Sequence, residues 1–208
     1  MSKDKDDRTL QMFVRSKRDW NRLLDPGESM LGLLALLITT PATVVVAVLI
    51  YITSPGPILY WSPRVGRHGR IFQMPKFRTM KVGTPQVATD KLVDPASRLT
   101  PIGGFLRKLS LDEIPQLWSV LKGDMSLVGP RPALFNQHEL IAARKARGID
   151  VLRPGITGWA QVNGRDDIPE WRKIELDEEY LRKRSFWFDM KILWLTVWRV
   201  LKRDGVSH

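Results

Sequence analysis

Residues 30–52 read MLGLLALLITTPATVVVAVLIYI, a run of 23 residues without a charged side chain. About 20 apolar residues in a helix span the hydrocarbon core of a bilayer, so the length alone makes this run a transmembrane candidate. A signal peptide fits poorly, because the run begins at residue 30 and no Ala-x-Ala-like cleavage site follows it. A buried helix of a soluble core fits poorly too, because a small core does not need so long an apolar run. We therefore expect a membrane-associated protein.

Pro41 lies near the centre of this run, directly after Thr39 and Thr40. A proline inside a helix removes one backbone donor and clashes with the carbonyl four residues earlier, so we expect a sharp bend. The threonine hydroxyls are suited to satisfy backbone groups that the proline frees. Each arm of about 11 residues is then ~16 Å long, roughly half of the hydrocarbon thickness. The pattern predicts a helix-break-helix over 30–52, broken at Thr40-Pro41.

Basic residues flank the apolar run on both sides. Arg and Lys occur at 15, 17, 18 and 22 before it, and at 64, 67, 70, 76 and 78 after it. A spanning helix usually has a Lys/Arg excess on its cytoplasmic side only. Two basic flanks fit a re-entrant hairpin whose ends both return to the cytoplasmic face. An ordinary kinked span with the globular part on one side stays open as the alternative.

The remaining chain predicts an α/β fold, helix-rich with a small β-sheet. Residues 1–29 form a basic N-terminal segment, with an interfacial amphipathic helix expected over 9–24. Residues 53–208 form the domain expected to lie at the cytoplasmic face. In it we expect strands over 58–61 and 71–80 and helices over 102–108, 112–121, 132–148, 169–184 and 186–203. The last helix combines tryptophans with basic residues, which fits a helix at the lipid headgroups; packing against the core is the alternative.

Composition narrows the chemistry. The 208 residues contain 33 Lys+Arg against 22 Asp+Glu, a formal charge of +11, which implies an anionic partner such as nucleic acid, a phosphorylated substrate or a membrane surface. The chain has no cysteine, which excludes a disulfide scaffold, a thiolate metal site and a cysteine nucleophile. Its three histidines are too far apart in sequence for an HExxH-type zinc motif.

Asp112 and Glu113 form an acidic pair that allows two interpretations. Ser110-x-x-Glu113 matches a capping box, in which the serine caps a helix and the glutamate bonds back to it; by pattern alone this structural interpretation is favoured. Adjacent carboxylates at a helix N-terminus also suit catalysis, because one can attack phosphorus while its neighbour holds a divalent cation. The two roles are compatible.

Four basic residues are candidates for binding phosphate. Lys76 and Arg78 alternate in an expected strand and would face the same side. Arg131 and Arg165 lie in loops rich in glycine, proline and arginine, which are suited to bring guanidinium groups and backbone N–H groups to phosphate oxygens. Solvated faces or structural ion pairs are the alternatives for these residues.

Three motifs resemble one family. KFRTM (76–80), SLDEIPQLWSVLKGDMSLVGPRP (110–132) and RPGITGWAQVNGR (153–165) are similar to the bacterial sugar transferases, the monotopic polyprenyl-phosphate phosphoglycosyl transferases. The resemblance covers about residues 20–205. Thr40-Pro41 stands where the family has a Ser-Pro break, and the entry to the membrane helix at 22–28 matches the family only loosely.

The resemblance implies a reaction and roles. Family members transfer a phosphosugar from a UDP-sugar to undecaprenyl phosphate and release UMP. By motif match, Asp112 is the nucleophile that forms an aspartyl-phosphosugar, Glu113 is associated with Mg²⁺, and Arg131 and Arg165 contact phosphate or nucleotide. The resemblance also implies a monotopic protein of the inner membrane with its catalytic domain in the cytoplasm.

The residues also indicate which other partners to expect. A nucleic-acid reader has no use for the acidic pair, so no nucleic-acid partner is expected. Membrane lipid is an expected partner, and a homodimer is a hypothesis motivated by apolar surface that a monomer would expose. The alternative function is a membrane-tethered protein that binds anionic lipid or nucleic acid without catalysis.

Overall fold

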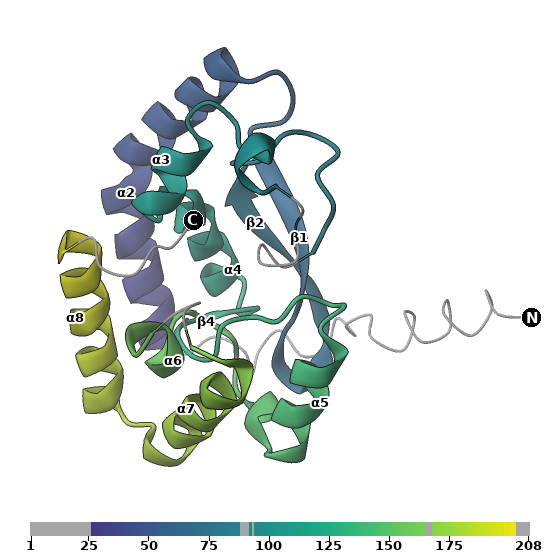
Figure 1. Ribbon diagram of the computed structural model, residues 1–208. Helices are drawn as coiled ribbons and strands as arrows, with labels where there is room; N and C mark the ends of the chain where they lie inside the picture. Colours follow the sequence, from purple (N-terminus) through teal and green to yellow (C-terminus); the bar gives the residue numbers. More distant parts are fainter. Residues whose placement is uncertain (1–25, 88–91, 93, 165–167, 203–208) are drawn as a thin grey trace, which may run out of the picture.

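The computed structural model describes residues 26–87, 92, 94–164 and 168–202. The elements are arranged on two sides of the molecule in Figure 1. The long helix α2 lies with α8 on one side, and a two-stranded hairpin lies with α5 on the other. The helices are α2 (Pro26–Thr53), α3 (Gly103–Lys108), α4 (Leu117–Leu121), α5 (His138–Ala146), α6 (Trp159–Val162), α7 (Glu170–Lys183) and α8 (Phe186–Lys202). The strands are β1 (Leu59–Val65), β2 (Ile71–Phe77), β3 (Ser126–Val128) and β4 (Gly155–Thr157). Short 3₁₀ helices are η2 (Arg67–Gly69), η4 (Ala96–Arg98), η5 (Leu111–Gln116) and η6 (Ile149–Val151).

The helix-rich α/β class is confirmed, with two small sheets in place of one. The helix expected over 132–148 is α5 alone, and the helix expected over 112–121 is divided into η5 and α4. The interfacial helix expected over 9–24 lies outside the described residues.

The division into two helices expected at Thr40-Pro41 is not observed, because α2 is one continuous helix from Pro26 to Thr53 with Pro41 inside it. The hydroxyls of Thr39 and Thr40 donate to the carbonyls of Ala35 and Leu36, both at 2.8 Å. Such back-bonding keeps threonine hydroxyls satisfied inside an apolar helix. Residues 30–53 are long and apolar enough to cross a bilayer, and only 11% of their most apolar part is buried in the protein. That exposure is unlike the core helix of a soluble domain.

The globular part packs along much of α2. A Cβ on Gly32, near the start of the helix, would contact the Val120 side chain of α4 at 3.3 Å. Near the other end, Val46 and Ile50 are buried in one apolar cluster with Phe77 and Leu106. The helix therefore lies against the domain instead of projecting away from it, as Figure 1 shows.

Strands β1 and β2 form an antiparallel hairpin (Figure 1), with Arg64 in β1 and Lys76 in β2. Tyr60 pairs with Lys76, Ser62 with Met74, and Arg64 with Phe72. Because paired residues in a hairpin project to the same face, and alternate residues share a face, all six side chains belong to one face. Pro75 is tolerated because a two-stranded sheet consists of edge strands only.

The parallel pair β3–β4 brings two distant loops together through glycines. A Cβ on Gly158 would lie 2.0 Å from the Gly129 carbonyl oxygen, and a Cβ on Gly155 would lie 2.1 Å from the Gly129 nitrogen. No side chain fits at such distances, so the glycines are required for this backbone approach. The segment after β3, residues 129–132, is thereby packed against residues 153–158.

Candidate active site

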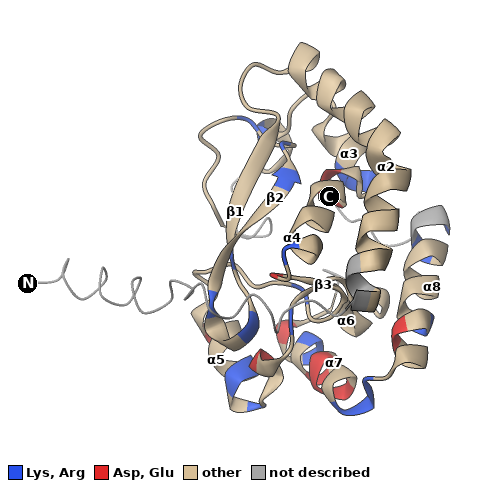
Figure 2. Ribbon diagram, turned by 180° about the vertical axis from the view of Figure 1, so that it is seen from behind, with Lys and Arg blue, Asp and Glu red and all other residues tan. Residues whose placement is uncertain are grey.

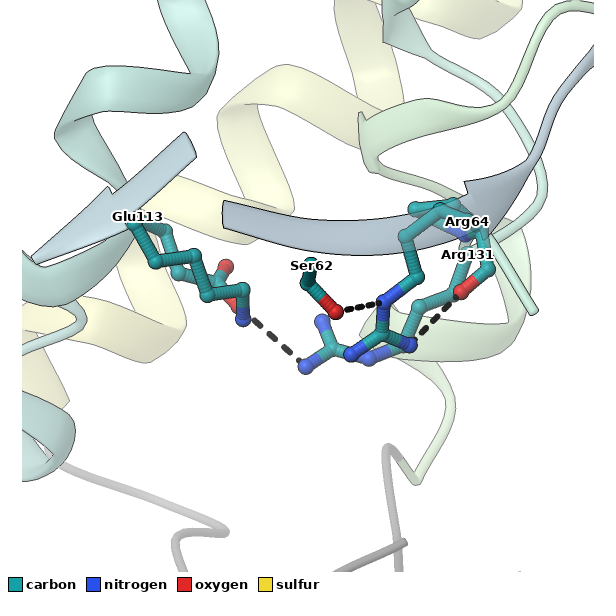
Figure 3. A network of polar contacts seen from close by, with 6 residues as sticks. Ser62, Arg64, Glu113 and Arg131 are labelled. Atoms are coloured by element: carbon teal, nitrogen blue, oxygen red, sulfur yellow. Dashed lines mark hydrogen bonds and ion pairs between the residues drawn. The ribbon is translucent and has the colours of Figure 1, made fainter. Parts of the chain in front are cut away.

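The acidic pair and two of the four predicted basic residues meet at one place. Lys76 comes from β2, Glu113 from η5 and Arg131 from the loop after β3. Lys76 Nζ lies 2.8 Å and Arg131 Nη2 lies 3.2 Å from the same oxygen, Glu113 Oε1 (Figure 3). Three segments far apart in the sequence thus share one carboxylate.

Asp112 has a different environment from Glu113. Its side chain is buried, with 7% of the residue exposed, and no hydrogen bond to its carboxylate comes from the part of the chain that the structure describes. Burial raises the pKa of the Asp112 carboxyl; the positive charge of Lys76 opposes this effect, and the negative charge of Glu113 adds to it. The pair therefore consists of one carboxylate that two cations contact directly and one that accepts no hydrogen bond from the described residues.

The capping box expected at Ser110 is not formed. Ser110 adopts a left-handed conformation (φ 55°, ψ 21°) and its side chain does not cap η5. The turn is closed instead by the backbone, because the Glu113 N–H donates to the Ser110 carbonyl at 3.2 Å. A left-handed conformation at a residue other than glycine stores strain, which is frequent at functional sites. The structural interpretation of the acidic pair thus loses its main support.

The structure does not bring Arg78 to this site. Strand β2 ends at Phe77, so the strand alternation that would align Arg78 with Lys76 does not extend to it. Arg78 is buried and donates to the Ser54 hydroxyl at 2.9 Å, the Ser54 carbonyl at 2.8 Å and the Pro57 carbonyl at 2.6 Å. All of these acceptors follow the end of α2, so Arg78 holds α2 to the hairpin. Arg165 lies outside the described residues.

Arg64 is a residue of the site that lies beyond the strand expected over 58–61. Strand β1 extends through it, and its Nε donates to Ser62 Oγ at 3.0 Å while its Nη1 donates to the Pro132 carbonyl at 3.1 Å (Figure 3). A small pocket is lined by Arg64, Lys76, Glu113 and Arg131, together with Met74, Gln116 and Pro132. The alternation of Tyr60, Ser62 and Arg64 in one strand was the available signal.

A buried ion pair supports the loop that carries Arg131. Arg144 of α5 donates through Nη2 and Nε to Asp177 Oδ2 of α7, at 2.7 and 3.1 Å, and Asp177 is 1% exposed. The third contact of Arg144, through Nη1, is with the Arg131 carbonyl at 2.8 Å. Burial raises the pKa of Asp177 although Arg144 lowers it, so the carboxylate depends on its partner. The helices α5 and α7 thereby fix the backbone of Arg131.

The carboxylates suit a magnesium ion that substrate helps to hold. Mg²⁺ takes oxygen ligands, commonly one or two carboxylates together with phosphate oxygens and water. Within the described ranges, no group of three or more His, Asp or Glu side chains forms a cage for a metal ion. Asp112 and Glu113 supply two carboxylates, so an ion here would depend on ligands from phosphate.

A comparison with protein families identifies the chain. The model of the bacterial sugar transferases matches residues 17–203, which include all of the site. The chain belongs to the bacterial sugar transferase family.

Relatives in this family carry names that state a reaction. An uncharacterized sugar transferase of Bacillus subtilis, EpsL, is 46% identical over 153 residues, which cover 74% of each chain. The UDP-glucose:undecaprenyl-phosphate glucose-1-phosphate transferase of Escherichia coli is 42% identical over 193 residues, 86% of this chain and 40% of that protein. The undecaprenyl-phosphate galactose phosphotransferase of Salmonella typhimurium is 40% identical over 168 residues, 72% of this chain and 34% of that protein. This sugar transferase therefore spans well under half the length of the two relatives whose reaction is named.

Proposed function

We propose that this chain is a phosphoglycosyl transferase that moves a phosphosugar from a UDP-sugar to undecaprenyl phosphate and releases UMP. The observation that carries the proposal is the pairing of a buried Asp112 carboxylate, which accepts no hydrogen bond from the described residues, with a cluster of Lys76, Glu113 and Arg131. The relatives from Escherichia coli and Salmonella typhimurium support the substrate class through the reactions in their names. The reaction would initiate the assembly of a bacterial glycan on a lipid carrier.

In the first half-reaction, an Asp112 carboxylate oxygen attacks the phosphorus that carries the sugar. A new P–O bond forms to Asp112, the P–O bond to the bridging oxygen breaks, and its electron pair leaves with UMP. Nucleophilic catalysis of this kind divides one difficult transfer into two easier ones. Lys76 and Arg131 offset the negative charge that otherwise repels a carboxylate from a diphosphate.

In the second half-reaction, a phosphate oxygen of undecaprenyl phosphate attacks the same phosphorus and restores the Asp112 carboxylate. The two anionic substrates then use one site in turn, which predicts ping-pong kinetics. Magnesium, when bound through Glu113 and phosphate oxygens, would neutralise charge on the transferred group.

The apolar surface supports a monotopic membrane protein. Large apolar side chains are exposed on α2, α3, α4 and α8, namely Leu33, Leu34, Leu37, Ile38, Val44, Val45, Val48, Phe105, Trp118, Trp194 and Trp198. Helices α2 and α8 lie along the same side of the molecule in Figures 1 and 2, and the described part of α2 in Figure 2 carries no Lys or Arg. Exposed tryptophans beside basic residues are typical of the headgroup region. We propose that this side lies in the cytoplasmic leaflet, with both ends of α2 at the cytoplasmic face.

The experiment that tests the function is nucleotide release by detergent-purified protein. UMP formation from a panel of UDP-sugars with undecaprenyl phosphate and Mg²⁺ is expected from wild type and absent from Asp112→Asn. Release of UDP would contradict the proposal, because it would mean that the sugar is transferred without its phosphate.

A further inference from the structure

Two arginine side chains of the site lie next to each other without a carboxylate between them. Arg64 and Arg131 line the same pocket, and Figure 3 shows their guanidinium groups side by side. Arg131 pairs with Glu113, but no carboxylate of the described residues lies within 4 Å of the Arg64 guanidinium. Burial and the charge of Arg131 lower the pKa of Arg64 to about 10, so the unliganded site carries unfavourable positive charge. An anion that enters between the two groups would relieve that repulsion.

Contacts with the residues after Arg131 fix the position of Arg64. The Val65 N–H donates to the Ala133 carbonyl at 2.9 Å, and an isolated β-bridge joins Arg64 to Leu134. Strand β1 is therefore joined to the residues that follow Arg131. The bonds of Arg64 to Ser62 Oγ and to the Pro132 carbonyl occupy Nε and Nη1, which leaves donors on Nη2. A guanidinium fixed in this way loses little entropy when it binds an anion.

Of the three cations of the pocket, Lys76 and Arg131 lie nearer to Asp112, the proposed nucleophile, than Arg64 does. Lys76 and Arg131 both contact Glu113, the neighbour of Asp112, whereas Arg64 contacts the residue after Arg131. Along the hairpin, Lys76 and Arg64 are four residue pairs apart, which is about 13 Å of strand. Lys76 and Arg131 act on the charge of Asp112, while Arg64 is not among the groups that do so. Arg64 therefore lies at the end of the site away from the attacking oxygen.

We infer that Arg64 and Arg131 form the subsite for the phosphate that leaves with the nucleoside, at the end of the site opposite Lys76. This inference rests on the proposed phosphosugar transfer. When the bond to the bridging oxygen breaks, its electron pair stays on the leaving phosphate, which gains one negative charge. Two guanidinium groups that meet this charge stabilise the transition state and bind the released nucleoside monophosphate.

The test measures UMP binding to the detergent-purified full chain by calorimetry, with Arg64→Gln compared with Arg67→Gln. Arg67 is a matched control, because it follows on the same hairpin, loses the same charge and, among the described residues, donates its side-chain hydrogen bond to the Val151 carbonyl. We expect Arg64→Gln to weaken UMP binding by about tenfold or more and Arg67→Gln to change it less than about threefold. Equal UMP affinity of Arg64→Gln and wild type would overturn the inference.

Two further variants separate binding from folding. Ser62→Ala keeps the charge of Arg64 and removes its bond to the Ser62 hydroxyl, so we expect a loss of about threefold in UMP affinity with unchanged thermal unfolding. Arg64→Lys keeps the charge without the planar fork, so its UMP affinity should fall between wild type and Arg64→Gln. An unfolded Arg64→Gln together with wild-type UMP affinity in both of these variants would assign Arg64 to structure only.

A second ligand distinguishes the leaving phosphate from the acceptor phosphate. Binding of a short-chain polyprenyl phosphate in detergent should be changed less than UMP binding by Arg64→Gln. The reverse pattern would overturn the inference, because it would place the acceptor in this subsite. If wild-type protein releases UMP and Arg64→Gln binds UMP as tightly as wild type does, this inference alone is contradicted. If wild-type protein releases no UMP from any UDP-sugar, the proposed function is contradicted.

Discussion

Arg78 binds Ser54 twice, through the carbonyl oxygen at 2.8 Å and the hydroxyl at 2.9 Å, directly after the end of α2. A third bond joins it to the Pro57 carbonyl. Because Lys76 of the candidate site lies two residues before Arg78, the same short segment supplies a side chain to the site and holds the end of α2. The position of the helix and the position of the site are thus linked through one buried side chain.

Removing this link should destabilise the protein. Arg78→Met leaves the Ser54 and Pro57 carbonyls without their buried donor, so we expect a loss of about 3 kcal/mol in the free energy of unfolding. The measurement is denaturant unfolding in detergent, with Arg98→Met as the control, since Arg98 is exposed in η4. Equal stability of the two variants would argue against the structural role of Arg78.

The close approach of the two glycine loops predicts a second stability effect. A Cβ at Gly158 would meet the Gly129 carbonyl oxygen, so Gly158→Ala should cost about 2 kcal/mol or more and displace the loop that carries Arg131. Gly104→Ala is the control, because the nearest atom to its new Cβ is 3.7 Å away and alanine favours helix α3. We expect the first variant to lose both thermal stability and UMP release and the control to keep both. A fully active Gly158→Ala would show that the loops do not need this contact.

The buried state of Asp112 predicts a dependence on pH. Since burial raises the pKa of Asp112, the carboxyl binds protons more tightly in the folded than in the unfolded protein, and folding stability falls as pH rises above about 4. Asp112→Asn removes this cost, so the variant should unfold at a higher temperature than wild type at pH 7.5, with a difference that narrows toward pH 4. The acid limb of kcat/KM should lie above the usual aspartate pKa of about 4. A variant less stable than wild type at pH 7.5 would contradict this account.

The monotopic proposal predicts a labelling pattern. The natural chain has no cysteine, so single cysteines at Ser16 and at the exposed Glu139 of α5 can be labelled without background. Both should react with a membrane-impermeant maleimide only from the cytoplasmic side. Labelling of one of the two from the periplasmic side would establish a spanning helix in its place.

Helices α7 and α8 were predicted to within one residue at each end because their apolar periodicity is strong, whereas the helices expected over 112–121 and 132–148 are shorter or divided in the structure. Strands β3 and β4 were not predicted, since three residues are too few for a pattern and their pairing depends on glycine contacts between distant loops. Arg78 was assigned to the site because a strand was expected over 71–80, but the strand ends at Phe77 in the structure, so the alternation does not reach Arg78. Ser110 matched a capping box, but its left-handed backbone prevents one.

The candidate site could be predicted from the sequence only in part. Asp112, Glu113, Lys76 and Arg131 lie in motifs whose resemblance to a family is specific. Arg64 was missed because its role depends on the register of β1 against β2 and on the contact of β1 with residues 132–134. Such long-range pairing is a property of the folded chain.

The most direct test of the central claim is mass spectrometry of the full chain in detergent, quenched in acid after incubation with a UDP-sugar and Mg²⁺ and without undecaprenyl phosphate. The account predicts release of one UMP per active protein and a phosphosugar adduct on a peptide that contains Asp112, which disappears when undecaprenyl phosphate is added. Asp112→Asn should form neither UMP nor the adduct. UMP released only when the lipid acceptor is present, with no adduct on Asp112, would contradict the covalent mechanism.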